Sequence, residues 1–181
     1  MPSEFWQTKM KTYFRCFDLN GDGDVSEDDF LEFGDRFIES GGFADGDAHV
    51  LRQDLGTFWE NYWKPADAND DGQVTEEEFI GAMTMAVNDP SRREGITDPL
   101  HILFKAIDAD NEGDISLLEF ETFYQCLGIN TEYIEEIFAG IDTDGDEVIS
   151  KQEFISSGRE FFLGEDESHP SRFFWGPLIA R

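Results

Sequence analysis

The stretch DANDDGQVTEEE, residues 67–78, carries a side-chain oxygen at each position where a twelve-residue calcium loop uses one. Asp67, Asn69 and Asp71 stand at positions 1, 3 and 5, from which their oxygens approach an ion on one side. Glu78 at position 12 supplies the carboxylate that closes the other side. Gly72 at position 6 permits the left-handed backbone of a sharp turn. The stretch therefore predicts a calcium-binding loop between two helices.

Three further stretches nearly repeat this pattern, at residues 18–29, 108–119 and 142–153. In chain order, with 67–78 second, we call the four stretches the first, second, third and fourth loops. Apolar residues at spacings of three and four precede and follow each loop, which predicts amphipathic helices on both sides. The chain thus resembles the EF-hand proteins. That resemblance implies short strand pairing between partner loops through the β-branched residues at position 8: Val25, Val74, Ile115 and Ile149.

The predicted fold is all-α, with four EF-hands arranged as two pairs of helix–loop–helix units and a short two-stranded β-bridge in each pair. Helical periodicity stops over residues 88–97, so we place the boundary between the pairs there. Asp98 followed by Pro99 predicts a helix N-cap and the first helical residue. The glycine-rich residues 41–46 are expected to end the second helix. The predicted units are an N-terminal pair at 1–88, a C-terminal pair at 98–170 and an apolar tail at 171–181 that packs on the core.

Each loop contributes side-chain oxygens at positions 1, 3, 5 and 12 and a backbone carbonyl at position 7, where the side chain is free to vary. The predicted metal ligands are Asp18, Asn20, Asp22, Asp24 and Asp29; Asp67, Asn69, Asp71, Gln73 and Glu78; Asp108, Asp110, Glu112, Asp114 and Glu119; and Asp142, Asp144, Asp146, Val148 and Glu153.

Three loops depart from the pattern. Asp29 closes the first loop with a side chain one methylene shorter than glutamate, which favours the sixfold coordination of magnesium, so we expect calcium and magnesium to compete there. Glu112 in the third loop is longer than the aspartate that usually occupies position 5. Glu147 holds position 6 of the fourth loop, and a non-glycine residue in a left-handed conformation costs about 1 kcal/mol. That cost corresponds to roughly fivefold weaker binding.

Composition excludes several classes of function. The chain has 41 acidic and 13 basic residues and a formal net charge of −28, which disfavours binding to nucleic acid and to anionic membranes. We find no signal sequence and no apolar stretch near the roughly 20 residues of a membrane span, so we expect a cytoplasmic protein. Pro2 excludes an N-myristoyl anchor.

Cys16 and Cys126 lie in amphipathic patterns and are expected to be buried, reduced thiols. No nucleophile or phosphate-binding glycine loop accompanies the scattered histidines, so we predict no enzymatic activity.

The opening FWQTKMKTYF and the apolar tail SRFFWGPLIAR, together with the 49-residue spacing of the first two loops (Asp18 to Asp67), resemble the invertebrate sarcoplasmic calcium-binding proteins. The resemblance covers nearly the whole chain. It implies a compact cytosolic buffer of calcium and magnesium with an aromatic-rich interior, for which we expect a monomer that requires no partner protein. Members of that family typically lack ligands in one or two loops, whereas this chain keeps acids in all four.

Two alternatives remain open. The coelenterazine-binding proteins and calcium-triggered photoproteins resemble the same architecture, and an interior of aromatic residues could hold a luciferin or another apolar ligand. A calmodulin-like sensor would instead expose a flexible, methionine-rich groove to partner helices. Four methionines against 18 phenylalanines favour permanent packing, and hence the buffer.

Overall fold

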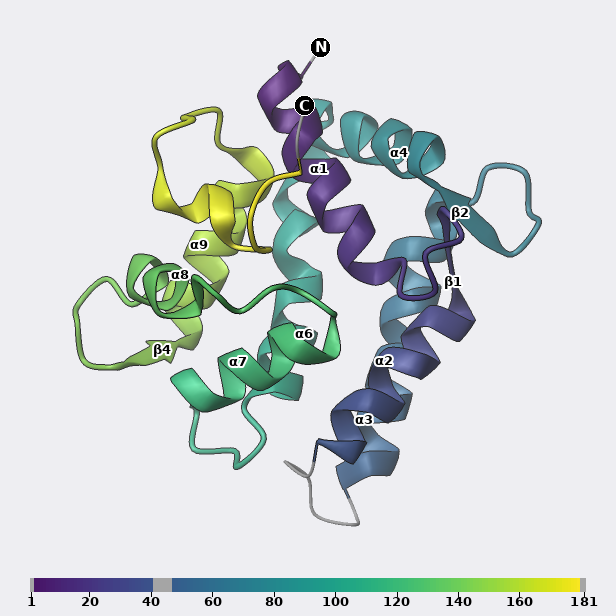
Figure 1. Cartoon of the computed structure of the whole chain (residues 1–181). Helices are drawn as coiled ribbons and strands as arrows, with labels where there is room; N and C mark the ends of the chain where they lie inside the picture. The colour runs from purple at the N-terminus through teal and green to yellow at the C-terminus, as the bar shows by residue number, and fades with distance from the viewer. Residues whose placement is uncertain (1, 41–46, 180–181) are drawn as a thin grey trace.

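A helix enters and a helix leaves each loop in the computed structural model, which describes residues 2–40 and 47–179 (Figure 1). These helices confirm the predicted all-α class with four EF-hands. They are α1 (Glu4–Phe17), α2 (Glu27–Glu39), α3 (Asp47–Phe58), α4 (Glu76–Asn88), α6 (Asp98–Ile107), α7 (Leu117–Cys126), α8 (Ile134–Ile141) and α9 (Lys151–Leu163).

The outgoing helix of each loop begins directly after position 9, which is serine or threonine throughout. In the second loop the Thr75 hydroxyl accepts the backbone N–H of Glu78 at 3.1 Å, and the Glu78 carboxylate accepts the backbone N–H of Thr75 at 3.0 Å. The same reciprocal pair recurs in the third and fourth loops. One local interaction therefore fixes both the start of the helix and the carboxylate at position 12.

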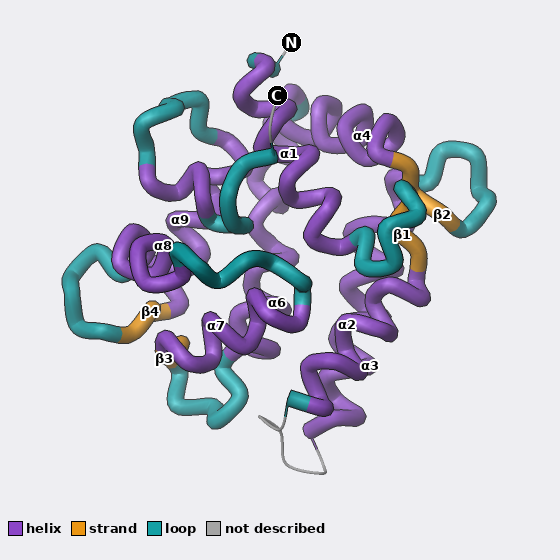
Figure 2. The backbone as a smooth tube through the Cα atoms, viewed as in Figure 1, coloured by secondary structure: helices purple, strands orange, loops and turns teal. Residues whose placement is uncertain are grey.

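Two short antiparallel sheets join the loops in pairs (Figure 2). β1 (Asp24–Ser26) pairs with β2 (Gln73–Thr75), and β3 (Asp114–Ser116) pairs with β4 (Val148–Ser150). The position-8 residues stand directly opposite each other and are fully buried: Val25 faces Val74, and Ile115 faces Ile149. This register confirms the predicted β-bridges.

Nearly all the buried apolar side chains of the described residues form one cluster that is shared by both EF-hand pairs. Tyr13 of α1 shows how the parts meet. Its ring lies 5.7 Å from that of Phe79 on α4, 5.1 Å from Phe162 on α9 and 4.7 Å from Trp175 near the C-terminus, measured between ring centroids. Rings at these separations attract one another beyond the burial of their area. α1 therefore holds the two pairs and the tail against one interior.

The C-terminal segment lies on this interior and passes close to α1 (Figure 1). Phe174 and Trp175 expose only 2% and 1% of their surface. The Tyr124 hydroxyl donates to the backbone carbonyl of Phe174 at 2.7 Å, and the backbone N–H of Ile179 donates to the Thr12 hydroxyl at 3.2 Å. These bonds satisfy polar groups that packing would otherwise leave without water.

The connection between the EF-hand pairs differs from the sequence prediction. Instead of irregular chain, it contains α5 (Pro90–Arg93) and a 3₁₀ turn (Glu94–Thr97). Because that turn leads straight into α6, Asp98 is already the first helical residue and Thr97 precedes the helix. The prediction of Asp98 as the N-cap is therefore wrong by one residue. The helix break expected at 41–46 lies outside the described residues.

The helix that enters the second loop also departs from a simple α-helical stripe. A π-helical turn (Trp59–Trp63) follows α3, and a 3₁₀ turn (Lys64–Ala66) leads into the loop. Trp63 is buried and stacks on Phe79 of the outgoing helix with ring centroids 4.7 Å apart. The wider turn thus accompanies the packing of a large indole ring beside the loop.

Cys16 and Cys126 are free and buried, as predicted. Burial raises the pKa of the Cys16 thiol to about 12, which keeps it protonated. None of the helices in the described part of the chain has the length and apolar character needed to cross a membrane.

Candidate metal centres

Backbone N–H groups orient the closing carboxylate of the second loop. One oxygen of Glu78 accepts the N–H of Ala68, at position 2, at 3.2 Å. The other accepts the N–H of Thr75, at position 9, at 3.0 Å. The closing acids Asp29, Glu119 and Glu153 make the same two contacts in their own loops. Position 12 is thereby held in the same place in all four loops.

A second set of bonds orients the acids at the front of the loop. Asp67 accepts the N–H of position 6 at 2.9 Å, Asn69 that of position 5 at 2.9 Å, and Asp71 that of position 7 at 3.0 Å. The first and fourth loops repeat all three contacts. In these three loops the side chains at positions 1, 3 and 5 therefore each have one oxygen fixed by the backbone, which limits the ordering that metal binding would require.

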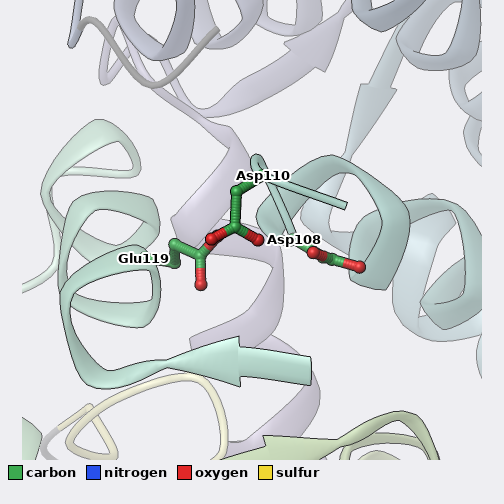
Figure 3. A group of neighbouring side chains, drawn as sticks. All are labelled: Asp108, Asp110 and Glu119. Atoms are coloured by element: carbon green, nitrogen blue, oxygen red, sulfur yellow. The ribbon is translucent and has the colours of Figure 1, made fainter. Parts of the chain in front are cut away.

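Carboxylate oxygens converge most closely in the C-terminal pair. Those of Asp108, Asp110 and Glu119 lie within 4.8 Å of one another, as do those of the three aspartates at positions 1, 3 and 5 of the fourth loop. Figure 3 shows Asp110 and Glu119 turned toward each other, with Asp108 beside them. Such an all-oxygen donor set suits a hard divalent cation such as calcium.

The residues at position 7 occupy equivalent places as well. Asp24, Gln73, Asp114 and Val148 are the first residues of β1, β2, β3 and β4, so the turn of each loop ends where its strand begins.

Two buried oxygens give a direct test of whether a cation fits. Asp18 Oδ1 and Asp108 Oδ1, at position 1 of the first and third loops, are shielded from solvent and accept no hydrogen bond within the described part of the chain. A buried carboxylate oxygen without a partner is costly, and a bound cation would satisfy it. The donors present therefore fit calcium.

The first loop differs at its closing residue, as its sequence predicts. Asp29 is 2% exposed, whereas glutamate at position 12 of the other loops is only half-buried. Both oxygens of Asp29 contact the backbone N–H groups of Leu19 and Ser26, at 3.2 and 2.9 Å. The shorter side chain therefore makes the same two backbone contacts as the glutamates but is more deeply buried.

The third loop differs at position 5. Asp22, Asp71 and Asp146 each accept the N–H of position 7, but Glu112 makes no such bond among the described residues. Its extra methylene places the carboxylate beyond that short-range contact. The longer side chain therefore lacks the support that orients its equivalents.

The fourth loop shows the backbone conformation expected at position 6. Glu147 has a φ of +72°, where the other three loops carry glycine. Sequence reasoning missed that position 4 is left-handed too, in every loop. Its occupants, Gly21, Asp70, Asn111 and Gly145, are residue types that tolerate this region, which is the sequence signal that could have identified it.

The surroundings of the loop acids shift their pKa values in opposite directions. Hydrogen bonds from the backbone of Gly72 lower the pKa of Asp67, and those from Thr75 lower the pKa of Glu78. Burial raises the pKa of Asp108, and the neighbouring Asp146 carboxylate raises that of Asp144. For Glu153, burial acts to raise the pKa, but hydrogen bonds from residues 150 and 143 outweigh it and lower the pKa to about 2. Repulsion from a neighbouring acid thus raises the pKa of Asp144 in the fourth loop, where a bound cation would relieve it.

Comparison with known proteins agrees with this geometry. The family model described as an EF-hand domain pair matches residues 97–157, and the EF hand model matches 10–33 and 66–83. The sarcoplasmic calcium-binding proteins of Perinereis vancaurica tetradentata and Hediste diversicolor are 32% and 33% identical to the chain, over 98% of its length and 100% of theirs. The calcium-loaded apo form of a coelenterazine-binding protein from Renilla muelleri superposes with a TM-score of 0.79 at 23% identity, covering 98% of this chain and 100% of that one.

Proposed function

The chain belongs to the sarcoplasmic calcium-binding protein family, and from this premise we propose that all four of its loops take up ions when it acts as a calcium buffer. The ligands are the twenty residues at positions 1, 3, 5, 7 and 12. The buried, unpartnered oxygens of Asp18 and Asp108 carry this proposal, because an ion at those positions removes a cost that the folded chain otherwise bears.

Calorimetric titration of the metal-free protein tests the ligand set. We expect four calcium ions in the wild type and three in Glu78→Gln, which loses the closing carboxylate of the second loop. Glu77→Gln is the matched control, because it removes the same charge from an exposed neighbour that stands outside the ligand positions. An unchanged stoichiometry and affinity in Glu78→Gln would reject the ligand assignment.

Magnesium competes with calcium chiefly in the first loop. The short, buried Asp29 supports this part of the proposal, because it cannot reach as far toward an ion as glutamate does. Asp29→Glu should therefore raise the ratio of calcium to magnesium affinity in that loop. Calcium titrations with and without magnesium measure the ratio, and the same ratio in both proteins would contradict the magnesium site.

Packing of the tail supports a buffer over a sensor. The rings of Trp175 and Phe174 lie 4.7 Å from Tyr13 and 5.0 Å from Phe154, on apolar surface that a sensor would present to a target helix. Deletion of 171–181 should expose that surface, increase the binding of a hydrophobic dye and lower the stability of the protein. Strong dye binding by the intact, calcium-loaded protein that disappears on chelation would favour the sensor.

Carriage of an apolar aromatic ligand is the second candidate, and one observation favours it. The Nε1–H of Trp175 is buried and has no hydrogen-bond acceptor among the described residues, so a polar atom of a ligand could accept from it. Titration with coelenterazine tests this function through quenching of tryptophan fluorescence. Saturable quenching that is lost in Trp175→Phe would support the carrier.

We also propose that the two EF-hand pairs and the tail work as one unit. The N-terminal pair (1–88), the C-terminal pair (98–170) and the tail (171–181) act together as a cytoplasmic monomer that needs no partner protein and no membrane anchor. The shared interior supports this organisation, because neither pair encloses its apolar residues alone. Sedimentation of the calcium-loaded protein at increasing concentration tests for the monomer.

A further inference from the structure

A polar cavity of about 740 Å³ lies beside the fourth loop. Its walls come from α5, from α8, from the loop and α9, and from the segment that follows α9. Arg93 of α5, Arg159 of α9 and His169 line it together. Two regions that are distant in sequence, α5 and the stretch from α9 to His169, thus bring basic groups to one cavity in a strongly acidic protein.

Acids far outnumber cations in this chain, which has 13 basic and 41 acidic residues. Neither Arg93 nor Arg159 makes an ion pair with a described carboxylate. Two guanidinium groups without protein partners in one cavity indicate a site for an anion, since arginine matches the paired oxygens of phosphate and carboxylate groups. Within residues 2–40 and 47–179, the cations that pair with carboxylates are Lys11, Arg36, Arg52, Lys64, Arg92 and Lys105.

A buried hydroxyl in the cavity wall also lacks a partner. Ser171 is 2% exposed, and its Oγ makes no hydrogen bond within the described residues. The backbone N–H of Ser171 donates to His169 Nδ1 at 3.2 Å, so the neutral imidazole carries its proton on Nε2 and can donate from there. The wall therefore offers a hydroxyl and an N–H in addition to the two guanidinium groups.

Acids in the same wall make the balance of charge depend on calcium. Asp144 and Glu153 line the cavity and are also proposed ligands of the fourth loop. The third acid, Glu160, interacts electrostatically with the buried ammonium group of Lys9. A calcium ion in the loop would neutralise the first two acids and leave the arginines to dominate the potential inside the cavity.

We propose that this cavity binds a small phosphomonoester that also carries several hydroxyl groups, and that calcium in the fourth loop strengthens the binding. The calcium dependence rests on the proposed ligands, whereas the anion site rests on the cavity itself. The two arginines and the imidazole hold the phosphate. Among the described residues, the His169 imidazole, which is assigned to the phosphate, is the one aromatic ring in the wall, whereas hydroxyl and amide groups are abundant there, so a sugar phosphate fits better than a nucleotide. Those polar groups belong to Thr143, Ser150, Gln152, Ser156 and Ser157.

Calcium-saturated protein titrated with glucose 6-phosphate tests the site, with amide chemical shifts as the readout. We expect saturable shifts around residues 157 and 171. Arg93→Gln and Arg159→Gln should each weaken binding about tenfold, the loss of one charge-assisted contact. Arg15→Gln is the matched control, because Arg15 is an exposed cation outside the cavity wall whose loss removes the same charge. Its affinity for glucose 6-phosphate should equal that of the wild type.

Glucose and gluconate separate the contributions of phosphate, carboxylate and hydroxyl groups. We expect no saturable binding of glucose and weaker binding of gluconate than of glucose 6-phosphate. The proposed specificity would be overturned if glucose bound as tightly as glucose 6-phosphate or if gluconate bound more tightly. It would also be overturned if glucose 6-phosphate showed no saturable binding, or if Arg15→Gln lost as much affinity as the two cavity variants.

A chelator arm tests the calcium dependence. Glucose 6-phosphate should bind more weakly to metal-free protein, and calcium should fail to restore the affinity in Asp142→Asn, which changes a fourth-loop ligand outside the cavity wall, while restoring it in Glu78→Gln. If calcium restores it equally in both variants, the coupling to the fourth loop is wrong. Ion stoichiometry in the same two variants reports separately on the ligand assignment, so failure of the buffer proposal and failure of the anion site are distinguishable.

Discussion

The second and fourth loops reach the same backbone geometry with opposite choices of residue. In the second loop, glycine occupies position 6 and Asp70 takes the left-handed conformation at position 4, with a φ of +60°. In the fourth, Gly145 occupies position 4 and Glu147 takes position 6, with a φ of +72°. Each of the two loops therefore holds one non-glycine residue in the left-handed conformation. Only in the second loop is that residue, an aspartate, of a type that tolerates the conformation well.

Their charges differ as well. The second loop places asparagine at position 3 and has three carboxylates among its ligand side chains, whereas all four in the fourth are acidic. Hydrogen bonds lower the pKa values of Asp67 and Glu78, but repulsion from Asp146 raises that of Asp144. The fourth loop thus combines a stronger attraction for cations with greater backbone strain and greater repulsion when metal-free.

Removal of calcium should have the largest effect and should affect the two loops unequally. An ion that binds only the folded state adds about 2.7 kcal/mol at a hundred times its dissociation constant, so chelation should lower the melting temperature markedly. Because the fourth loop gathers more ligand charge, the amide of Ile149 should lose more protection from hydrogen exchange than that of Val74. These residues occupy the same position in the two loops. Equal loss would show that ligand charge does not set the stability of the metal-free loops.

Acidification should release calcium from the fourth loop at a higher pH than from the second. A carboxylate whose pKa is raised takes up a proton at a higher pH, so Asp144 protonates before Asp67, whose pKa is lowered. Glu153, with a pKa of about 2, remains ionised through this range and cannot be the cause. Calcium titrations of Glu78→Gln and Glu153→Gln between pH 6 and 4 compare the loops. An earlier loss from the second loop would contradict the pKa directions.

Much of this architecture follows from local sequence. The parts that could not be predicted share one cause. Ligand spacing predicts the loops, and the hydroxyl at position 9 predicts the helix starts, because both act within a few residues. The aliphatic residue at position 8 predicts the β-bridges, because it has the same place in every EF-hand motif. The π turn before the second loop and the helical linker were not predicted, since both depend on packing against distant elements. The burial of Asp29 and the unsupported Glu112 follow from side-chain length only once the hydrogen-bond framework of the loop is known.

Exchanging the residue at position 6 should shift affinity in opposite directions. Glu147→Gly should tighten calcium binding in the fourth loop roughly fivefold, because it removes about 1 kcal/mol of left-handed strain. The reverse change, Gly72→Glu, should weaken the second loop by a similar factor. Glu147→Gln separates the two effects, because it removes the charge and keeps the strain. Weaker binding in both Glu147→Gly and Glu147→Gln would mean that the charge of Glu147 outweighs its strain.

Position 4 should show the smallest effect of the series. Aspartate adopts the left-handed region more readily than glutamate does, and the backbone N–H of Asp70 donates to Asp67 Oδ1 at 2.7 Å, a bond that supports the turn whichever side chain is present. Asp70→Gly should therefore change calcium affinity less than twofold, because only a few tenths of a kcal/mol of strain are relieved. Asp70→Asn controls for the lost charge, since asparagine tolerates the same conformation. Calorimetry on both variants measures these affinities. Suppose that Asp70→Gly tightens calcium binding as much as Glu147→Gly does, while Asp70→Asn has no effect. The cost of the left-handed conformation would then be the same for any residue other than glycine. The opposite assignments of the two loops would in that case carry no difference in strain, and the difference in ligand charge alone would distinguish them.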